Sequence, residues 1–163
     1  MTILLRAITY SVLFIGFILV FLPAQVLSEA GVMRPALLGP AQFAGMVVTA
    51  LGATIALSCI LTFVFIGRGT PAPFDPPRRL VARGPYSHVR NPMYLGAGLA
   101  LTGAALFYET GALGVYAAGF LVTMHFMVVF YEEPTLGRTF GEEYEAYCRQ
   151  VRRWWPIRRR RTA

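Results

Sequence analysis

Two short polar clusters hold most of the residues that could carry out chemistry, and each lies at the end of an apolar stretch. The first cluster is RRLVARGPYSHVRNPMYLG, residues 78–96, where arginines, a Gly-Pro pair and aromatic residues lead into an apolar run. The second is Tyr131-Glu132-Glu133-Pro134, which follows the last apolar run. Arginines bind carboxylates, carboxylates bind ammonium groups and hydroxyls, and helix N-termini favour anions. We predict that the two clusters meet in one site at a membrane face.

A histidine, His125, lies within the last apolar run and adds to this site. Ionisable groups at membrane depth are commonly functional. His125 precedes Glu132 by seven residues, or two helical turns, so both side chains can point toward one site. His125 and Glu133 are therefore the candidate catalytic residues. A purely hydrogen-bonding role for His125, close to the end of the span, is the alternative.

The elements that must position these residues are membrane helices. The chain has 163 residues, 56% of them hydrophobic, and it lacks Asp, Glu, Lys and Arg in four long stretches: 7–28, 35–67, 91–108 and 110–131. Because a bilayer core of about 30 Å requires roughly 20 helical residues, we predict an all-α polytopic membrane protein with four transmembrane helices, near 5–26, 43–66, 92–108 and 111–131. The third spans only about 25 Å, so we expect one of its ends to lie in the interface or under protein.

We expect a single membrane domain over 1–163, with two packing helices in 1–67 and with the loop, helical hairpin and tail in 68–163. Asn91 and Pro92 suit the N-cap and first position of the third helix. Small residues share one face of the second and third helices and favour close backbone packing in lipid. They are Gly45, Thr49, Gly52 and Ala56, and then Gly96, Ala100 and Gly103 or Ala104.

The loop and the tail are basic. The 68–90 loop carries five arginines and one aspartate, and the tail carries eight arginines and five glutamates. The positive-inside rule places both termini and the 68–91 loop in the cytoplasm. All 15 basic residues are arginine, which suggests a bacterial protein of the inner membrane. We expect membrane lipid, and no nucleic acid, to contact the arginine run 158–161.

Two further segments, one in the loop and one in the tail, have sequence patterns that predict their structure. The Gly- and Pro-rich stretch 69–77 excludes helix and sheet, and we predict an ordered loop over the end of the bundle. Phe140, Tyr144, Tyr147 and Val151 recur at helical spacing and predict a cytoplasmic C-terminal amphipathic helix. This helix would lie along the membrane or cover the loop, with Trp154 and Trp155 as interface anchors.

Residues 69–156 resemble the isoprenylcysteine carboxyl methyltransferase and phospholipid methyltransferase superfamily of integral-membrane enzymes. The matching motifs, in family order, are Leu80-Val81 with Gly84-Pro85-Tyr86, Arg90-Asn91-Pro92-Met93-Tyr94, Glu132-Glu133 and Phe140-Gly141-Glu142-Glu143-Tyr144. The resemblance implies S-adenosylmethionine as methyl donor, with direct transfer and no covalent enzyme intermediate. It also implies a pocket between the loop, the following helix and the tail. The implied cofactor-binding residues are Leu80, Val81, Tyr86, Arg90, Asn91, Pro92, Met93, Tyr94 and Glu132.

Two departures concern the methyl acceptor. Asn91 stands where the prenylcysteine enzymes have histidine, and Val128 stands where they have a substrate-binding arginine. The acceptor is therefore a lipophilic small molecule or lipid, with a lipid amine, a small apolar acid or amine, and a prenylated carboxylate as alternatives. An NADPH-dependent membrane reductase and a non-catalytic module that keeps the fold are the competing functions. The sequence does not indicate the oligomeric state.

Overall fold

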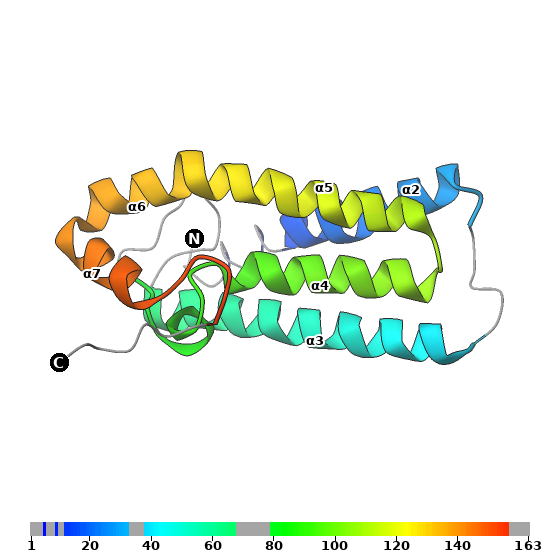
Figure 1. Cartoon of the computed structure of the whole chain (residues 1–163), viewed down its shortest axis with the longest axis horizontal. Helices are drawn as coiled ribbons and strands as arrows, with labels where there is room; N and C mark the ends of the chain where they lie inside the picture. Colours follow the sequence, from blue (N-terminus) through cyan, green and yellow to red (C-terminus); the bar gives the residue numbers. More distant parts are fainter. Residues whose placement is uncertain (1–4, 6–8, 10–11, 33–37, 68–78, 157–163) are drawn as a thin grey trace.

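The computed structural model describes residues 5, 9, 12–32, 38–67 and 79–156, and these form a bundle of helices (Figure 1). The proline-rich stretch 69–77 and the arginine run 158–161 lie outside the described residues. Within the described ranges, the extended pairing is limited to a parallel bridge between Val89 and Arg152. The predicted all-α class is confirmed. The helical segments in order are η1 (Ile15–Phe21), α2 (Leu22–Glu29), α3 (Pro40–Thr62), η2 (Phe63–Gly67), η3 (Gly84–Ser87), α4 (Pro92–Phe107), α5 (Gly111–Met127), η4 (Val128–Glu132), α6 (Glu133–Phe140) and α7 (Glu142–Gln150).

Among the described residues, three helices are long and apolar enough to cross a membrane: Val12–Glu29, Pro40–Gly67 and Gly111–Phe140, with 18, 28 and 30 residues. The fourth predicted span, α4, is apolar but has 16 residues, which corresponds to about 24 Å of helix. The prediction of four spans is therefore confirmed for three helices only. Helix α4 lies between α3 and the long helix formed by α5 and α6 (Figure 1). Neighbouring helices thus cover much of its surface.

Helices α3 and α4 pack backbone to backbone through the predicted small-residue faces. A Cβ atom on Gly52 would lie 2.4 Å from the Gly96 carbonyl oxygen and 2.5 Å from the Ala100 nitrogen. A Cβ on Gly103 would lie 2.5 Å from the Thr49 nitrogen. Such distances leave no room for a side chain, so the close antiparallel contact depends on these glycines. The prediction that these faces allow close backbone packing is confirmed.

The last membrane helix does not end at residue 131 as predicted. It continues through Glu132, Glu133 and Pro134 to Phe140, and residues 128–132 are π-helical. Proline lacks an N–H group and clashes with the preceding turn of an α-helix. A wider π-helical turn accommodates this residue. The two glutamates therefore lie on a helix rather than at the start of a loop.

The helix predicted in the tail from the spacing of Phe140, Tyr144, Tyr147 and Val151 corresponds to α7 and is shorter than this pattern. Gly141 has φ +50° and ψ −125°, which separates α6 from α7, and Val151 is extended. Tyr144, Tyr147 and Val151 nevertheless form one buried cluster, which packs against loop residues such as Leu80. The Tyr147 hydroxyl also donates a hydrogen bond of 2.7 Å to the Tyr86 carbonyl. In the described residues, this part of the tail covers the loop.

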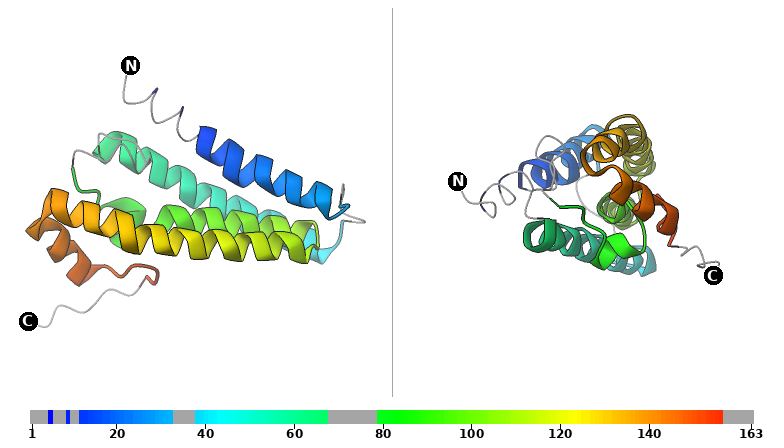
Figure 2. Two further views of the ribbon diagram at one scale, coloured as in Figure 1. Left: turned by 90° about the horizontal axis from the view of Figure 1, so that it is seen from above. Right: turned by 90° about the vertical axis from the view of Figure 1, so that its left-hand side faces the viewer.

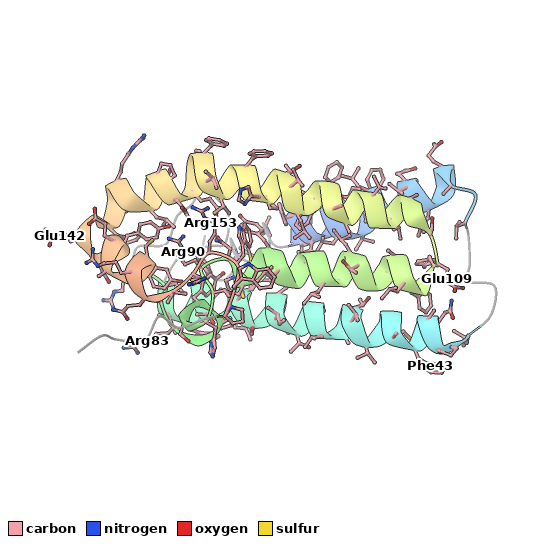
Figure 3. The ribbon with its side chains drawn as sticks, in the orientation of Figure 1. Phe43, Arg83, Arg90, Glu109, Glu142 and Arg153 are labelled. Atoms are coloured by element: carbon pink, nitrogen blue, oxygen red, sulfur yellow. The ribbon has the colours of Figure 1, made fainter. Side chains whose placement is uncertain are left out.

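The opposite end of the bundle has its own polar contact (Figure 3). The buried Gln42 amide donates to the Glu109 carboxylate at 2.9 Å and to the Phe107 carbonyl at 3.3 Å. Its oxygen accepts from the Gly39 N–H at 2.9 Å, so α3 begins at Pro40 instead of residue 43. Gln42 thus ties the start of α3 to the turn between α4 and α5.

Candidate functional site

The two polar clusters predicted to meet are in contact in the structure. Arg90, at the end of the loop, pairs with Glu133 at 3.1 Å between Nη2 and Oε1. The Tyr94 hydroxyl, on the first turn of α4, donates a hydrogen bond to Glu132 Oε1. The prediction that these clusters come together is confirmed. Their role in a reaction remains a prediction.

Glu132 and Glu133 contact different partners because they are adjacent on a helix. Successive side chains on a helix point about 100° apart. Glu132 consequently faces α4 and Tyr94, whereas Glu133 faces the loop and the tail. The pair therefore supplies two carboxylates with separate surroundings.

Glu133 lies between two guanidinium groups. Arg153, in the tail, donates to it from Nε at 2.8 Å and from Nη2 at 2.6 Å, and Arg90 approaches the same carboxylate. The hydrogen bonds with Glu133 raise the pKa of Arg153 above its ordinary value. Sequence reasoning did not single out Arg153. The signal that could have found it is the pair of adjacent arginines, Arg152 and Arg153, which follows the predicted tail helix.

A segment that we call the tail strap, Val151–Trp154, runs alongside the end of the loop. The Arg90 N–H donates to the Arg152 carbonyl at 2.9 Å, and Asn91 Nδ2 donates to the Arg153 carbonyl at 3.3 Å. Asn91 occupies the N-cap position of α4, but its side chain makes no capping bond. The predicted start of α4, with Asn91 as N-cap and Pro92 as first residue, is thus confirmed, whereas the side chain of Asn91 donates to the tail strap and makes no capping bond.

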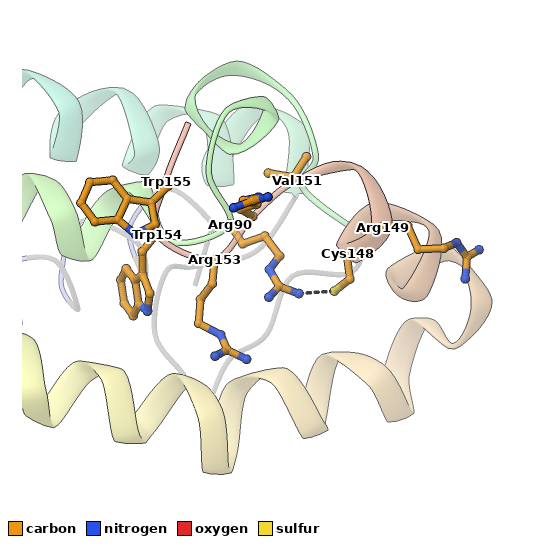
Figure 4. A pocket seen from close by; sticks show the side chains of 8 residues that line it. Arg90, Cys148, Arg149, Val151, Arg153, Trp154 and Trp155 are labelled. Carbon is orange, nitrogen blue, oxygen red and sulfur yellow. Dashed lines mark hydrogen bonds between the residues drawn. The ribbon is translucent and has the colours of Figure 1, made fainter. Parts of the chain in front are cut away.

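A cavity of about 410 Å³ opens between the loop, α7 and the tail strap (Figure 4). Its walls carry four cations, two indole rings and a thiol, and Arg90 Nη1 donates to Cys148 Sγ. Sequence reasoning did not identify Cys148 as a site residue. The cavity therefore favours an anionic group together with a flat or aromatic one. Its lining residues are Arg90, Cys148, Arg149, Val151, Arg152, Arg153, Trp154 and Trp155.

His125 contacts the tail strap. The indole N–H of Trp154 donates to His125 Nδ1 at 3.1 Å, and the two ring centroids are 6.0 Å apart. Glu132 instead contacts Tyr94. The π-helical residues 128–132 explain this divergence, because a π-helical turn takes more residues than an α-helical turn and seven residues no longer return to the same face. A neutral His125 that accepts at Nδ1 carries its proton on Nε2.

Trp154 also connects the cavity wall with the apolar core. It lines the cavity and packs against the hydrophobic cluster that contains Tyr94 and Val128. Glu132 and its partner Tyr94 are not among the residues that line this cavity. Val128 is fully buried, so the position of the arginine found in prenylcysteine enzymes belongs here to the apolar core.

The remaining predicted cofactor residues lie around the cavity rather than on its wall. Val81 and Tyr86 form a buried cluster with Cys59, in which the Tyr86 ring meets Phe63 edge to face at 5.3 Å. Burial raises the pKa of Tyr86 well above its ordinary value. Three others are placed as follows: Leu80 packs against the α7 cluster, Pro92 begins α4, and Met93 packs against the clusters of both Tyr86 and Tyr94. Among the predicted cofactor residues, Arg90 is the one on the cavity wall.

Comparison with known proteins gives one match. A family model described as phospholipid methyltransferase (PEMT) matches residues 40–143, which is more than half of the chain. No curated protein and no solved structure matches the chain significantly. The matched region runs from the start of α3 into α7 and includes the loop, α4 and both glutamates.

Proposed function

The chain belongs to the phospholipid methyltransferase family, and from this premise we propose that it transfers a methyl group from S-adenosylmethionine to a lipophilic acceptor. The family and the three long apolar helices together indicate a membrane methyltransferase. The cofactor, the acceptor and the residues that bind them belong to the proposal.

One observation carries the proposal: the two glutamates have separate partners beside a cationic cavity. S-Adenosylmethionine carries a carboxylate, an ammonium group, ribose hydroxyls, an adenine ring and a sulfonium. Arg90 suits the carboxylate, Glu132 suits the ammonium group or the hydroxyls, and Trp154 suits the ring or the sulfonium. A volume of about 410 Å³ is within the usual range of small-molecule pockets, about 300–1,000 Å³. The residues present therefore fit this cofactor.

The residues of this chain would bind the cofactor, align the acceptor with its methyl group and exclude water from the site. When bound, the cofactor supplies an electrophilic methyl group. Methyl transfer from a sulfonium needs a nucleophile held close and in line, which the protein supplies by positioning. The sulfonium charge disappears in the reaction, so a dry site formed by Trp154 and the buried Tyr94 favours transfer. An amine acceptor must also lose a proton, for which His125 or Glu133 is the candidate base. A carboxylate acceptor needs no base.

For the acceptor, we favour a lipid amine over a prenylcysteine carboxylate. The position of the family's substrate-binding arginine is Val128, which is fully buried among apolar side chains. No cation at that position is available for a carboxylate. The acceptor would enter from the lipid between helices, and the site would face the cytoplasm, as the arginine distribution indicates.

Calorimetry on detergent-purified protein tests the cofactor. We expect micromolar binding of S-adenosylmethionine, no binding of NADPH, and binding at least tenfold weaker in Glu132→Gln. Glu142→Gln makes the same chemical change at an exposed residue outside the cavity and should bind like the wild type. NADPH binding alone would favour a reductase. Binding of neither by folded protein would favour a non-catalytic module.

A native thiol gives a second test. Cys148 lines the cavity, whereas Cys59 is fully buried. A maleimide should thus react with Cys148 first, as peptide mapping by mass spectrometry can verify. Saturating S-adenosylmethionine should slow this reaction at least fivefold. Binding without protection would place the cofactor elsewhere in the protein.

A further inference from the structure

The tail strap joins both halves of the candidate site. Its backbone accepts hydrogen bonds from Arg90 and Asn91, at the start of α4. Its side chains reach Glu133 and His125 on the long helix formed by α5, η4 and α6. Figure 4 shows Arg153 directed from the strap toward that helix. The tail strap therefore connects two elements whose relative position determines the shape of the site.

Arg153 makes the strongest of these contacts. Its guanidinium donates two hydrogen bonds to Glu133, at 2.8 and 2.6 Å, and two such parallel bonds fix both distance and orientation. Arg90 pairs with the same carboxylate at 3.1 Å. The side chains of Arg90 and Glu133 are 14% and 18% exposed, so water screens this contact less than it screens a surface pair.

Without Arg153, Arg90 would be the remaining cation at Glu133. Arg90 divides its donors between Glu133 and Cys148, and its Nε is buried with no hydrogen-bond partner. A carboxylate with a single neighbouring guanidinium attracts that guanidinium more strongly. The two groups prefer a bidentate contact with two parallel hydrogen bonds. Arg90 would then turn toward Glu133 and away from the cavity. Arg153 limits this movement, because it donates to both oxygens of Glu133 and leaves Arg90 a single longer contact of 3.1 Å.

We propose that Arg153 is a positioning residue of the cofactor site, which holds Glu133 and thereby keeps Arg90 directed into the cavity. This inference rests on the proposed function. The inference requires that Arg153 act on cofactor affinity through Glu133. It also requires that the bidentate geometry of Arg153, and not only its charge, contribute to that affinity. A residue that only anchored the tail would contribute to stability without being coupled to cofactor affinity.

The test is a double-mutant cycle on the full-length protein in detergent. The variants are Arg153→Leu, Glu133→Gln and the double variant, with cofactor affinity measured by calorimetry. We expect Arg153→Leu to weaken S-adenosylmethionine binding about tenfold, and the double variant to bind no more weakly than Glu133→Gln alone, because Arg153 acts through Glu133. Additive losses would overturn the inference. Arg138→Leu, at an exposed residue of α6 outside the cavity, is the matched control and should bind like the wild type.

A conservative variant separates geometry from charge and covers the case in which Arg153→Leu does not fold. Arg153→Lys keeps the cation but loses the paired contact, so its affinity should lie between those of the wild type and Arg153→Leu, and at least threefold below the wild type. Wild-type affinity in Arg153→Lys would overturn the positioning role. If the wild-type protein binds no S-adenosylmethionine, the proposed function itself fails. If the wild type binds and affinity is unchanged in folded Arg153→Leu, this inference alone fails.

Discussion

At the scale of residues, the site depends on how its charges are paired. Glu133 has two guanidinium groups within 3.1 Å, whereas Glu132 has a tyrosine hydroxyl. Removing one partner of a poorly solvated ion pair usually costs more than the pair contributes to stability, because the remaining charge stays unpaired. Substitutions of Arg90, Glu133 and Arg153 should thus be interpreted together.

His125 gives a prediction at the same scale. The Trp154 N–H uses the Nδ1 lone pair of His125, so this histidine can act as a base only after that hydrogen bond breaks. We expect His125→Ala to leave S-adenosylmethionine affinity within twofold of the wild type and to lower kcat with an amine acceptor at least tenfold. Calorimetry and single-turnover kinetics measure the two quantities.

The matched control for this prediction is Thr123→Ala, which removes an exposed side chain on the same helix. If kcat of His125→Ala equals that of the wild type, His125 serves only as the hydrogen-bond partner of Trp154. If affinity falls together with kcat, the histidine holds Trp154 against the cavity rather than acting on the acceptor.

At the scale of elements, two of the π-helical segments are followed by a proline. Pro23 follows the π-helical residues Ile15–Phe21, and Pro134 follows Val128–Glu132. In both places the helix continues past the proline. The wider turn removes the steric conflict that a proline causes in an α-helix. This is why a proline after Glu133 does not end the helix, and why both glutamates have fixed helical directions.

The contact between α3 and α4 gives the second prediction. We expect Gly52→Ala to lower the free energy of unfolding by about 1–3 kcal/mol, since overpacking in a close contact has costs of this size. A Cβ atom there would lie 2.4 Å from a backbone oxygen, which cannot move independently of α4. Thermal or denaturant unfolding in detergent measures the change.

Gly114→Ala on α5 is the control, because nothing lies within 4 Å of a Cβ at that position. Alanine is favoured over glycine inside a helix by about 0.5–1 kcal/mol, so this variant should be as stable as the wild type or more so. Equal stability of Gly52→Ala and the wild type would show that the two helices can separate slightly without loss.

At the scale of the whole molecule, polar groups gather at the two ends of the bundle. Arg90 and Arg153 lie at one end and Glu109 lies at the other (Figure 3). Phe65 and Val115 are about three-quarters exposed along the sides, as expected for surfaces that contact lipid. The formal net charge is +7. Together these features support a membrane protein, and the positive-inside rule predicts that its arginine-rich end faces the cytoplasm.

Thiol labelling of intact spheroplasts tests this orientation. We expect a membrane-impermeant maleimide to leave Cys148 unlabelled until the membrane is permeabilised. Gly111→Cys in a Cys148→Ser background should be labelled in intact spheroplasts, because residue 111 is exposed at the opposite end of the bundle. The reverse pattern of labelling would show that the site faces away from the cytoplasm.

The sequence by itself determined the helical class, the apolar segments, the two small-residue faces and the two polar clusters. Each of these follows from a local or periodic property, such as a stretch without charges or the spacing of Gly45 and Gly52. It also contained the motifs through which the family can be recognised. The meeting of Arg90 with Glu133 could be expected, because the start of one membrane helix and the end of the next lie at the same face of the membrane.

Only the tertiary structure decided which partner each polar group has. The continuation of the helix past Pro134 sets Glu132 and Glu133 about 100° apart, and the π-helical turn moves His125 to Trp154. The break at Gly141 returns the chain over the loop, so that Arg153 reaches Glu133. These outcomes depend on backbone geometry at single residues and on contacts between distant segments. A periodic pattern of residue types cannot specify either of them.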